Sequence, residues 1–316
     1  MKTTIVGRLI LQERMKKNIS QNDLCYGVCN RTTLSRIENG EIMPSYTLAC
    51  VLFTRLGKSV PNNLIPLRAN ERKIYNIDFK MNQLRDNRDE RGEEWLKEYK
   101  KYINEKDFFN MQCYLLYLGI TKKKKIETFE ESLVIHEKAL KLTQPDFSLK
   151  NKEMPKGLLS ATELSLLRCI AHTEYYIYDS NQIDFERKNS ALKRIFFLKE
   201  YFENHIENYK SNSLYSSINF CLSSWLGLDG KYTDALEIAK GYVINNPDSL
   251  YFLSHELYDM GYLQACLEQK IEARKTLNDS FVLVNMYDEF NEVEYYVKRT
   301  DEIFHFKPPL DSKTFL

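Results

Sequence analysis

The sequence predicts an all-α protein with a small N-terminal helix-turn-helix domain followed by a longer array of helical repeats. Residues 19–45 contain two short helical stretches separated by a tight turn. From about residue 70 the apolar residues recur at helical spacing, with short polar breaks and few β-like alternations. A chain of 316 residues with 43% hydrophobic residues is long enough to build two hydrophobic cores.

The predicted helix-turn-helix lies between Ile19 and Ser45. Ser20 can cap a short first helix, and a brief turn around Cys29–Asn30 leads into a second helix, Thr32–Asn39. Gly40 can end that helix in a left-handed conformation, and Ser45 is the expected cap of the next helix. Two helices joined by a tight turn form the helix-turn-helix pattern.

Helical spacing divides the side chains of this segment into two faces. The residues expected to point inward are Leu24, Val28, Leu34 and Ile37. The residues expected to point outward are Gln21, Arg31, Thr32, Thr33, Ser35 and Arg36. Most of the outward side chains donate hydrogen bonds and carry little apolar bulk, as a surface that binds a polar partner requires. The alternative interpretation is an ordinary helical hairpin with a solvated polar face.

The motif residues are Ser20-Gln21, Leu24, Ser35-Arg36-Ile37-Glu38-Asn39-Gly40 and Pro44-Ser45. With them, residues 1–60 resemble the helix-turn-helix of the phage-repressor (XRE) family, which implies a five-helix lambda-repressor-like domain over residues 1–66. The turn is one residue shorter than in most of that family, and Cys29 stands where its glycine usually lies. The shortened turn resembles the PlcR/Rgg-like (RRNPP) group of peptide-responsive regulators.

The resemblance implies that the second helix lies in the major groove of double-stranded DNA, with Arg31, Thr32 and Arg36 nearest the base edges. It also implies that Gln21 and Asn39 hold phosphates. The candidate DNA-binding residues are Gln21, Arg31, Thr32, Thr33, Ser35, Arg36 and Asn39. One small domain makes few contacts, so we expect a homodimer on a two-fold operator.

The opening segment, Thr3–Lys17, is predicted to be a helix that braces the motif. Its apolar residues available for packing are Ile5, Leu9 and Met15, and Arg8 and Arg14 are expected to be solvated. After a further helix, 47–56, the small core is expected to close with Val60, Leu64 and Ile65. Pro61 and Pro66 mark the end of the domain, and residues 67–90 are expected to form a linker helix.

Residues 91–305 are predicted to form a degenerate tetratricopeptide-like, right-handed α-solenoid, followed by a tail, 306–316. The candidate helix pairs are 70–87 with 91–104, 107–120 with 125–142, 160–179 with 184–207, 214–229 with 232–245, and 250–267 with 270–286, before a last helix, 288–303. Ser223 is followed twelve residues later by Ala235, and Gly261 twelve residues later by Ala273. The offset is 38 residues, where the tetratricopeptide repeat has 34. Small residues at these points let paired helices approach closely.

The concave face of such a stack, lined by the first helix of each pair, can bind an extended peptide. The candidate peptide-binding residues are Arg168, His172, Tyr175, Tyr176, Ser217, Asn219, Phe220, Ser224, His255, Tyr258 and Tyr262. They combine aromatic surface with hydrogen-bonding groups, which suits a short signalling peptide. The alternative for each aromatic residue is that it belongs to the helix-packing core.

Charge is distributed unevenly along the chain. Residues 1–60 hold 9 basic and 4 acidic residues, a net charge of +5, and the remainder has a net charge of −4. The positive charge therefore accompanies the helix-turn-helix, where it can attract phosphates. Seven cysteines without a CxxC pair or a neighbouring histidine predict neither a disulfide framework nor a zinc site.

Several function classes find no support in the sequence. We find no HExxH motif, no nucleophile with a supporting base and no phosphate-binding loop, so we expect no enzyme activity, no metal and no cofactor. No secretion signal and no long apolar run is apparent, so we expect a cytoplasmic protein without a membrane partner.

The resemblance to the RRNPP group implies a transcription regulator whose DNA binding is controlled by a short peptide, as in quorum sensing. Three alternatives are open: a regulator whose repeats bind another protein, a phage-arbitrium-like regulator, and a peptide sensor that acts directly on a response regulator. Members of the last class lack the Ser35–Gly40 motif, which argues against it. The direction of the peptide effect, the operator and the peptide sequence do not follow from the residues.

Overall fold

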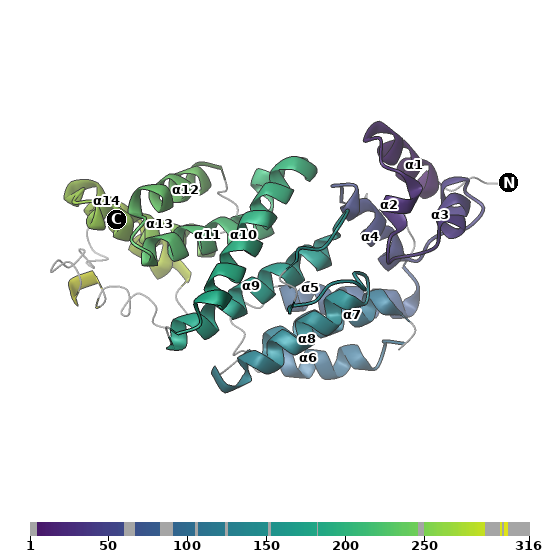
Figure 1. Cartoon of the computed structure of the whole chain (residues 1–316), viewed down its shortest axis with the longest axis horizontal. Coiled ribbons are helices and arrows are strands. Elements are labelled where there is room, and N and C mark those ends of the chain that lie inside the picture. The colour runs from purple at the N-terminus through teal and green to yellow at the C-terminus, as the bar shows by residue number, and fades with distance from the viewer. Residues whose placement is uncertain are drawn as a thin grey trace. The chain divides into compact units, whose positions relative to one another are not determined.

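A computed structural model describes residues 5–59, 67–82, 91–104, 107–123, 126–150, 153–181, 183–245, 250–287, 298 and 300–302. Every regular element in these ranges is a helix, so the prediction of an all-α fold is confirmed (Figure 1). The chain divides into two compact units, residues 1–207 and residues 208–316.

The first unit begins with the helix-turn-helix domain. Its helices are α1 (Ile5–Lys16), α2 (Gln21–Cys25), α3 (Arg31–Glu38) and α4 (Tyr46–Arg55). They share one hydrophobic core, which contains Val6, Ile10, Leu24, Leu34, Ile37, Leu52 and Leu56. The predicted fifth helix, with Val60, Leu64 and Ile65, lies outside the described residues.

The predicted buried face of α1 needs a correction. Ile5 and Met15 are exposed by 64% and 60%, whereas Arg14, which we expected to be solvated, is only 8% exposed. Apart from Gly7, the buried positions are Val6, Ile10 and Arg14, which follow one another at four-residue spacing and therefore share one face of the helix. Ile5 and Met15 lie on the opposite side.

The predicted helix pairs are confirmed with shifts of a few residues at their ends. In the first unit they are α5 (Ala69–Asn82) with α6 (Arg91–Lys100), α7 (Phe108–Lys122) with α8 (Phe129–Lys141), and α9 (Ala161–Asn181) with α10 (Phe185–His205). In the second unit they are α11 (Ser213–Leu228) with α12 (Tyr232–Asn245) and α13 (Leu250–Cys266) with α14 (Lys270–Tyr287). Two short 3-10 helices, Ile126–Thr128 and Tyr209–Ser211, precede α8 and α11.

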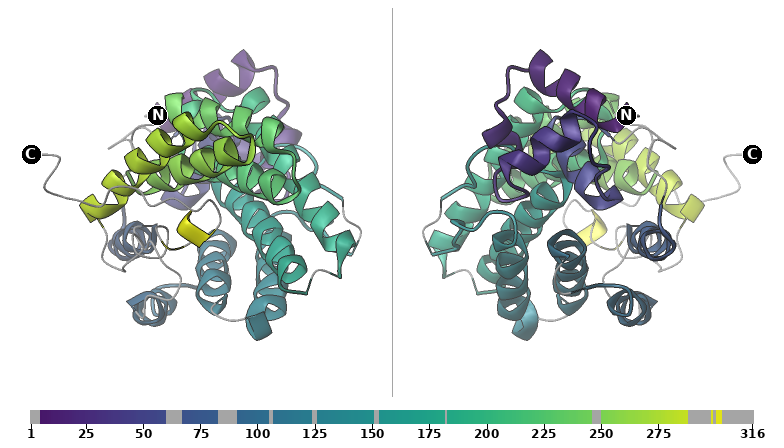
Figure 2. Two further views of the ribbon diagram at one scale, coloured as in Figure 1. Left: turned by 90° about the vertical axis from the view of Figure 1, so that its left-hand side faces the viewer. Right: turned by 90° about the vertical axis from the view of Figure 1, so that its right-hand side faces the viewer.

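Each pair also packs on the next pair of its own unit, as in a tetratricopeptide stack. In the first unit α8 contacts α9, and in the second unit α12 contacts α13. Figure 2 shows these antiparallel helices from two further sides. Most of the predicted last helix, 288–303, and the whole tail lie outside the described residues.

The 38-residue repeat is visible in the backbone of the second unit. At the end of α11 the amide of Gly230 donates to the Gly227 carbonyl and that of Lys231 donates to the Leu226 carbonyl. At the end of α13 the equivalent bonds run from Glu268 to Ala265 and from Gln269 to Gln264. Both turns need a left-handed residue, with φ of 75° at Gly230 and 60° at Glu268. The same turn is therefore built twice, once with glycine and once with glutamate.

Small residues bring the paired helices together, as the sequence predicted. Ala235 and Ala273 are fully buried, and a Cβ atom added to Gly261 would lie 2.6 Å from the Leu277 side chain. In the pair α7–α8 a small residue also lets the helices approach closely, although the sequence analysis did not identify it. A Cβ atom on Gly119 would lie 2.3 Å from the His136 ring.

A buried ion pair joins the helix-turn-helix domain to the repeats of the first unit. Arg55, at the end of α4, bonds to Glu163, near the start of α9, with 2.8 Å between Nη2 and Oε1, and neither side chain is exposed to solvent. The Thr143 hydroxyl and the Ser160 amide also donate to Glu163. Burial alone would raise the pKa of Glu163, but Arg55 and these hydrogen bonds hold it below its ordinary value.

We predict that Glu268→Gly raises the free energy of unfolding by about 0.5–1 kcal/mol, because glycine adopts a left-handed conformation without the steric conflict of a Cβ atom. Urea unfolding of the full chain measures the change. The matched control is Gly230→Ala, which introduces a Cβ atom into the equivalent turn where no other atom lies within 4 Å. Gly230→Ala should lower the free energy of unfolding by about 1 kcal/mol. A change of the same sign in both variants would contradict the equivalence of the two turns.

Candidate nucleic-acid interface

Side-chain caps begin both helices of the motif. The Ser20 hydroxyl accepts a hydrogen bond from the Asp23 amide at 3.1 Å, and the Asn30 side chain accepts one from the Thr33 amide at 2.7 Å. The predicted Ser20 cap is thus confirmed, whereas the Asn30 cap starts α3 one residue earlier than expected. The left-handed residue of the intervening turn is Gly27, with φ of 65°, and not the position of Cys29.

The predicted inner face of the motif is confirmed. Leu24, Leu34 and Ile37 have no solvent exposure, and Val28 packs against the same core. Gly40 ends α3 with φ of 73°, and the Ser45 side chain accepts from the Leu48 amide to start α4. These features fix the rotation of α3 about its axis. The outward residues of α3 consequently have a defined direction.

The exposure of the candidate DNA-binding residues follows the predicted helical face. Arg31, Thr32, Arg36 and Asn39 are exposed, and Gln21, Thr33 and Ser35 are partly exposed. Arg36 has 54% of its side chain exposed and forms an ion pair with Glu41, 3.3 Å from Nε to a carboxylate oxygen. An exposed pair of this kind contributes little stability, so Glu41 can give way to another anion.

A buried polar network lies directly behind this face. The Arg14 guanidinium binds Glu38 through two hydrogen bonds, 2.7 Å from Nε to Oε1 and 2.9 Å from Nη2 to Oε2. Gln21 donates to Glu38 at 2.7 Å and accepts from Arg31 Nε at 3.2 Å. Gln21 is thus engaged inside the protein, and its contacts orient Arg31. The role of Glu38 in this network escaped the sequence analysis because its partner is 24 residues away.

The candidate peptide-binding residues of the first unit lie on α9. Tyr175 is 3% exposed and belongs to the core, Tyr176 is 43% exposed, and Arg168 and His172 are partly exposed. The Lys123 ammonium contacts His172 and lies over the Tyr176 ring, 4.6 Å from its centroid. Burial, together with the charges of Lys123 and Arg168, lowers the pKa of His172 well below its ordinary value.

The candidates of the second unit lie on α11 and α13. Asn219 and Tyr258 are 6% and 7% exposed, so they too belong to the helix packing. The others, Ser217, Phe220, Ser224, His255 and Tyr262, are partly exposed. Phe220 meets the His255 ring edge-on at 6.2 Å, and burial lowers the pKa of His255 to about 4. Part of the predicted surface thus consists of packed aromatic residues, which was the alternative interpretation.

Within the described residues, no group of His, Cys, Asp and Glu side chains is arranged to hold a metal ion. None of the described helices has both the length and the apolar character required to cross a membrane.

The chain matches no protein-family model and no curated protein sequence. It is similar to the solved structure of Bacillus thuringiensis PlcR in complex with the peptide PapR7 and DNA, with 17% sequence identity and a TM-score of 0.50 over 94% of this chain and 98% of PlcR. ComR from Streptococcus suis matches with 15% identity and a TM-score of 0.44 over 97% of both chains. The similarity to PlcR confirms the fold that the resemblance implied, a helix-turn-helix domain followed by tetratricopeptide-like repeats.

We predict that Glu38→Ala lowers the free energy of unfolding by about 3–5 kcal/mol, because it leaves the buried Arg14 guanidinium without its anionic partner. The control is Glu41→Ala, which removes the exposed partner of Arg36 and should change stability by less than about 0.5 kcal/mol. Urea unfolding followed by circular dichroism measures both. Equal effects of the two substitutions would show that the network behind α3 does not support the domain.

Proposed function

We propose that the chain is a sequence-specific DNA-binding transcription regulator whose DNA binding is controlled by a short signalling peptide bound to its repeats. The observation that carries the proposal is the exposed face of α3. Arg31, Thr32 and Arg36 point to solvent there, while the fully buried Leu34 and Ile37 fix the direction of that face. This arrangement provides donors for base edges on a helix of defined orientation.

In the proposed complex, α3 lies in the major groove. Arg36 exchanges its ion pair with Glu41 for guanine, a bidentate contact that contributes about 1–3 kcal/mol of discrimination between bases. Arg31, held by Gln21, approaches a base edge or a phosphate, and Thr32, Thr33, Ser35 and Asn39 supply further donors. Gln21 itself acts by positioning Arg31, because its side chain is occupied by Glu38 and Arg31. The net charge of +5 in residues 1–60 adds attraction to the phosphates.

The proposed assembly is a homodimer on a two-fold operator. A single helix-turn-helix domain contacts too few base pairs for tight specific binding, and two domains read half-sites about one helical turn, or a multiple of it, apart. The protein acts in the cytoplasm, where it meets both DNA and an imported peptide, and it has no catalytic role.

The peptide part of the proposal is supported by α9. This helix carries Glu163, which binds Arg55 of the helix-turn-helix domain, and between about one and four turns later it carries Arg168, His172 and Tyr176. PlcR was solved with both a peptide and DNA, and we extend that combination to this chain. A peptide that binds more tightly to one conformation of α9 than to another shifts the equilibrium toward the first conformation. The helix-turn-helix domain, which is attached to α9 through Arg55, then moves with it.

In each unit the proposed peptide surface consists of the candidates that reach solvent. These are Arg168, His172 and Tyr176 in the first unit, and Ser217, Phe220, Ser224, His255 and Tyr262 in the second. We leave out Tyr175, Asn219 and Tyr258 because they are buried. A protein partner is the alternative occupant. This alternative would be favoured if a folded protein domain changed the affinity for DNA and short peptides did not.

We predict that Arg36→Ala weakens binding to the operator about tenfold or more at constant salt, because a bidentate guanine contact is lost. Fluorescence anisotropy with duplex DNA from the regions flanking the gene for this chain measures the affinity. The control is Arg274→Ala, which removes an exposed arginine of the second unit and should leave the affinity within about twofold. An unchanged affinity of the Arg36→Ala protein would exclude α3 as the reading helix.

We predict that Tyr176→Ala changes the response of DNA binding to peptide while leaving the affinity without peptide within about twofold. The same assay is run with synthetic peptides encoded by short open reading frames next to the gene. Tyr176 is exposed, so its truncation removes contact surface without opening the core. The control is Phe196→Ala, an exposed aromatic residue of α10. If both variants respond to peptide as the unmodified protein does, the peptide does not bind at Tyr176.

A further inference from the structure

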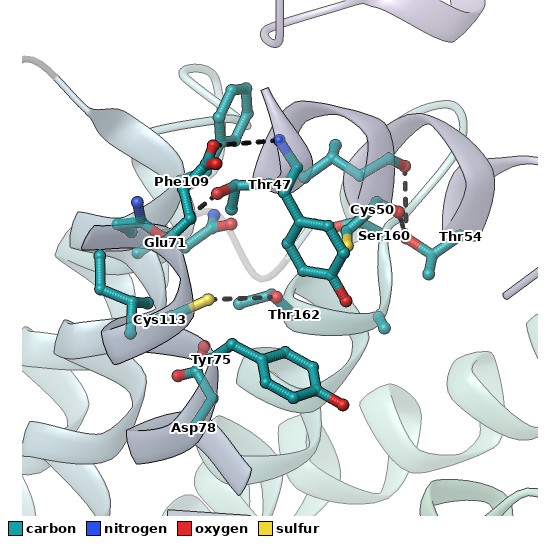
Figure 3. Close-up of a pocket in the computed structure, with 16 residues that line it drawn as sticks. Thr47, Cys50, Thr54, Glu71, Tyr75, Asp78, Phe109, Cys113, Ser160 and Thr162 are labelled. Carbon is teal, nitrogen blue, oxygen red and sulfur yellow. Dashed lines mark hydrogen bonds between the residues drawn. The ribbon is translucent and has the colours of Figure 1, made fainter. Parts of the chain in front are cut away.

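A cavity of ≈ 130 Å³ lies where α4, α5 and α7 meet the start of α9, within the first unit (Figure 3). It is separate from the exposed face of α3 and from the residues of the proposed peptide surface. Its wall combines apolar side chains, such as Val51 and Ile74, with hydroxyl groups and two carboxylates, Glu71 and Asp78. No lysine, arginine or histidine is among the residues that line it.

Most polar groups of the wall already have hydrogen-bond partners. Glu71 accepts from the Tyr46 amide at 3.3 Å and from the Arg68 amide at 2.7 Å. Thr47 donates to Asn110, and Cys113 is paired with Thr162. These groups therefore hold α4, α5, α7 and α9 against one another without a ligand.

Asp78 is only partly satisfied, because the hydroxyls of Tyr99 and Tyr117 donate to its carboxylate but one of its oxygens is left over. Its Oδ1 atom is buried and has no hydrogen-bond partner among the described residues. Figure 3 shows this carboxylate beside Tyr75 at one side of the cavity. A buried carboxylate oxygen without a donor is unfavourable by several kcal/mol relative to one in water. The wall thus offers one acceptor oxygen without a donor, together with negative charge that no cation among the described lining residues balances.

We propose that this cavity binds a small primary alkylammonium ion, with its ammonium group donating to Asp78 and its alkyl group packing against Ile74, Val51 and the Tyr75 ring. The charge of the ligand follows from the carboxylates and from the lack of a basic side chain in the wall. Its size follows from the cavity volume, which accommodates a few carbon atoms. The site requires neither DNA nor peptide.

The protonation of Asp78 gives the site a measurable signature. Burial raises the pKa of Asp78 to about 7, and the nearby hydroxyls of Tyr99 and Tyr117 offset only part of that rise. The other titratable groups that line the cavity are Tyr46 and Cys50 of α4, Glu71 and Tyr75 of α5, and Cys113 of α7. A bound ammonium favours the ionised carboxylate, so binding at pH 6 expels a proton and binding at pH 8 does not. Affinity should therefore be higher at pH 8 than at pH 6.

The test is isothermal titration calorimetry of the full chain with n-butylammonium chloride, compared with butan-1-ol and sodium butyrate. We expect the ammonium ion to bind at least tenfold more tightly than either neutral or anionic analogue. Titrations at pH 6 in two buffers of different ionisation enthalpy should show release of a proton. Equal binding of the alcohol, or no binding of the amine at 50 mM, would overturn the proposal.

Asp78→Asn keeps the size of the side chain and removes its charge, so it should abolish the preference for the amine. The control is Asp234→Asn, an exposed aspartate at the start of α12, which should leave binding unchanged. Circular dichroism establishes that both variants are folded. If Asp78→Asn does not fold, the amine-to-alcohol ratio and the proton release of the unmodified chain decide the question alone.

Discussion

The first unit depends on the buried contact between Arg55 and Glu163. Neither side chain reaches solvent, and each has several further hydrogen bonds. A buried ion pair adds little stability over well-packed apolar residues, but loss of one partner leaves an uncompensated charge and costs about 3–5 kcal/mol. The pair therefore determines which surfaces of α4 and α9 meet. It also reaches the recognition motif, because Arg55 Nη1 donates to the carbonyls of Leu24 and Tyr26.

The turn between α2 and α3 is thus attached to the repeats by its backbone. A Cβ atom on Gly27 would lie 2.0 Å from the Thr143 carbonyl oxygen, and the Tyr26 hydroxyl donates to Asp146 at 2.6 Å. These contacts hold the turn directly against the segment that follows α8. A displacement of α8 or α9 consequently moves the α2–α3 turn with it. The contacts thus couple α3 to the repeats of the first unit, as the proposed regulation requires.

The sequence predicted what local chemistry controls: the helix caps at Ser20 and Ser45, the left-handed Gly40, the helical pairs and their small residues. It did not predict contacts between distant polar residues. Arg14 was assigned to solvent because it is charged, although its spacing from Val6 and Ile10 placed it on the buried face. Its partner Glu38, like the partner of Arg55 108 residues away, becomes visible only in three dimensions. The same limit applies to Tyr175 and Tyr258, whose aromatic character fits a groove and a core equally well.

The location of Glu163 bears on how this protein can be divided. A fragment that ends near residue 66 keeps Arg55 and discards the carboxylate, the Thr143 hydroxyl and the Ser160 amide that complete its environment. Helix α4 of this fragment would expose apolar surface around the Arg55 guanidinium, which would have lost its carboxylate partner. Water would then compete with the carbonyls of the α2–α3 turn for hydrogen bonds from Arg55. Cutting the chain at the boundary of the helix-turn-helix domain therefore removes the buried partner of Arg55, whereas a fragment that includes α9 keeps it.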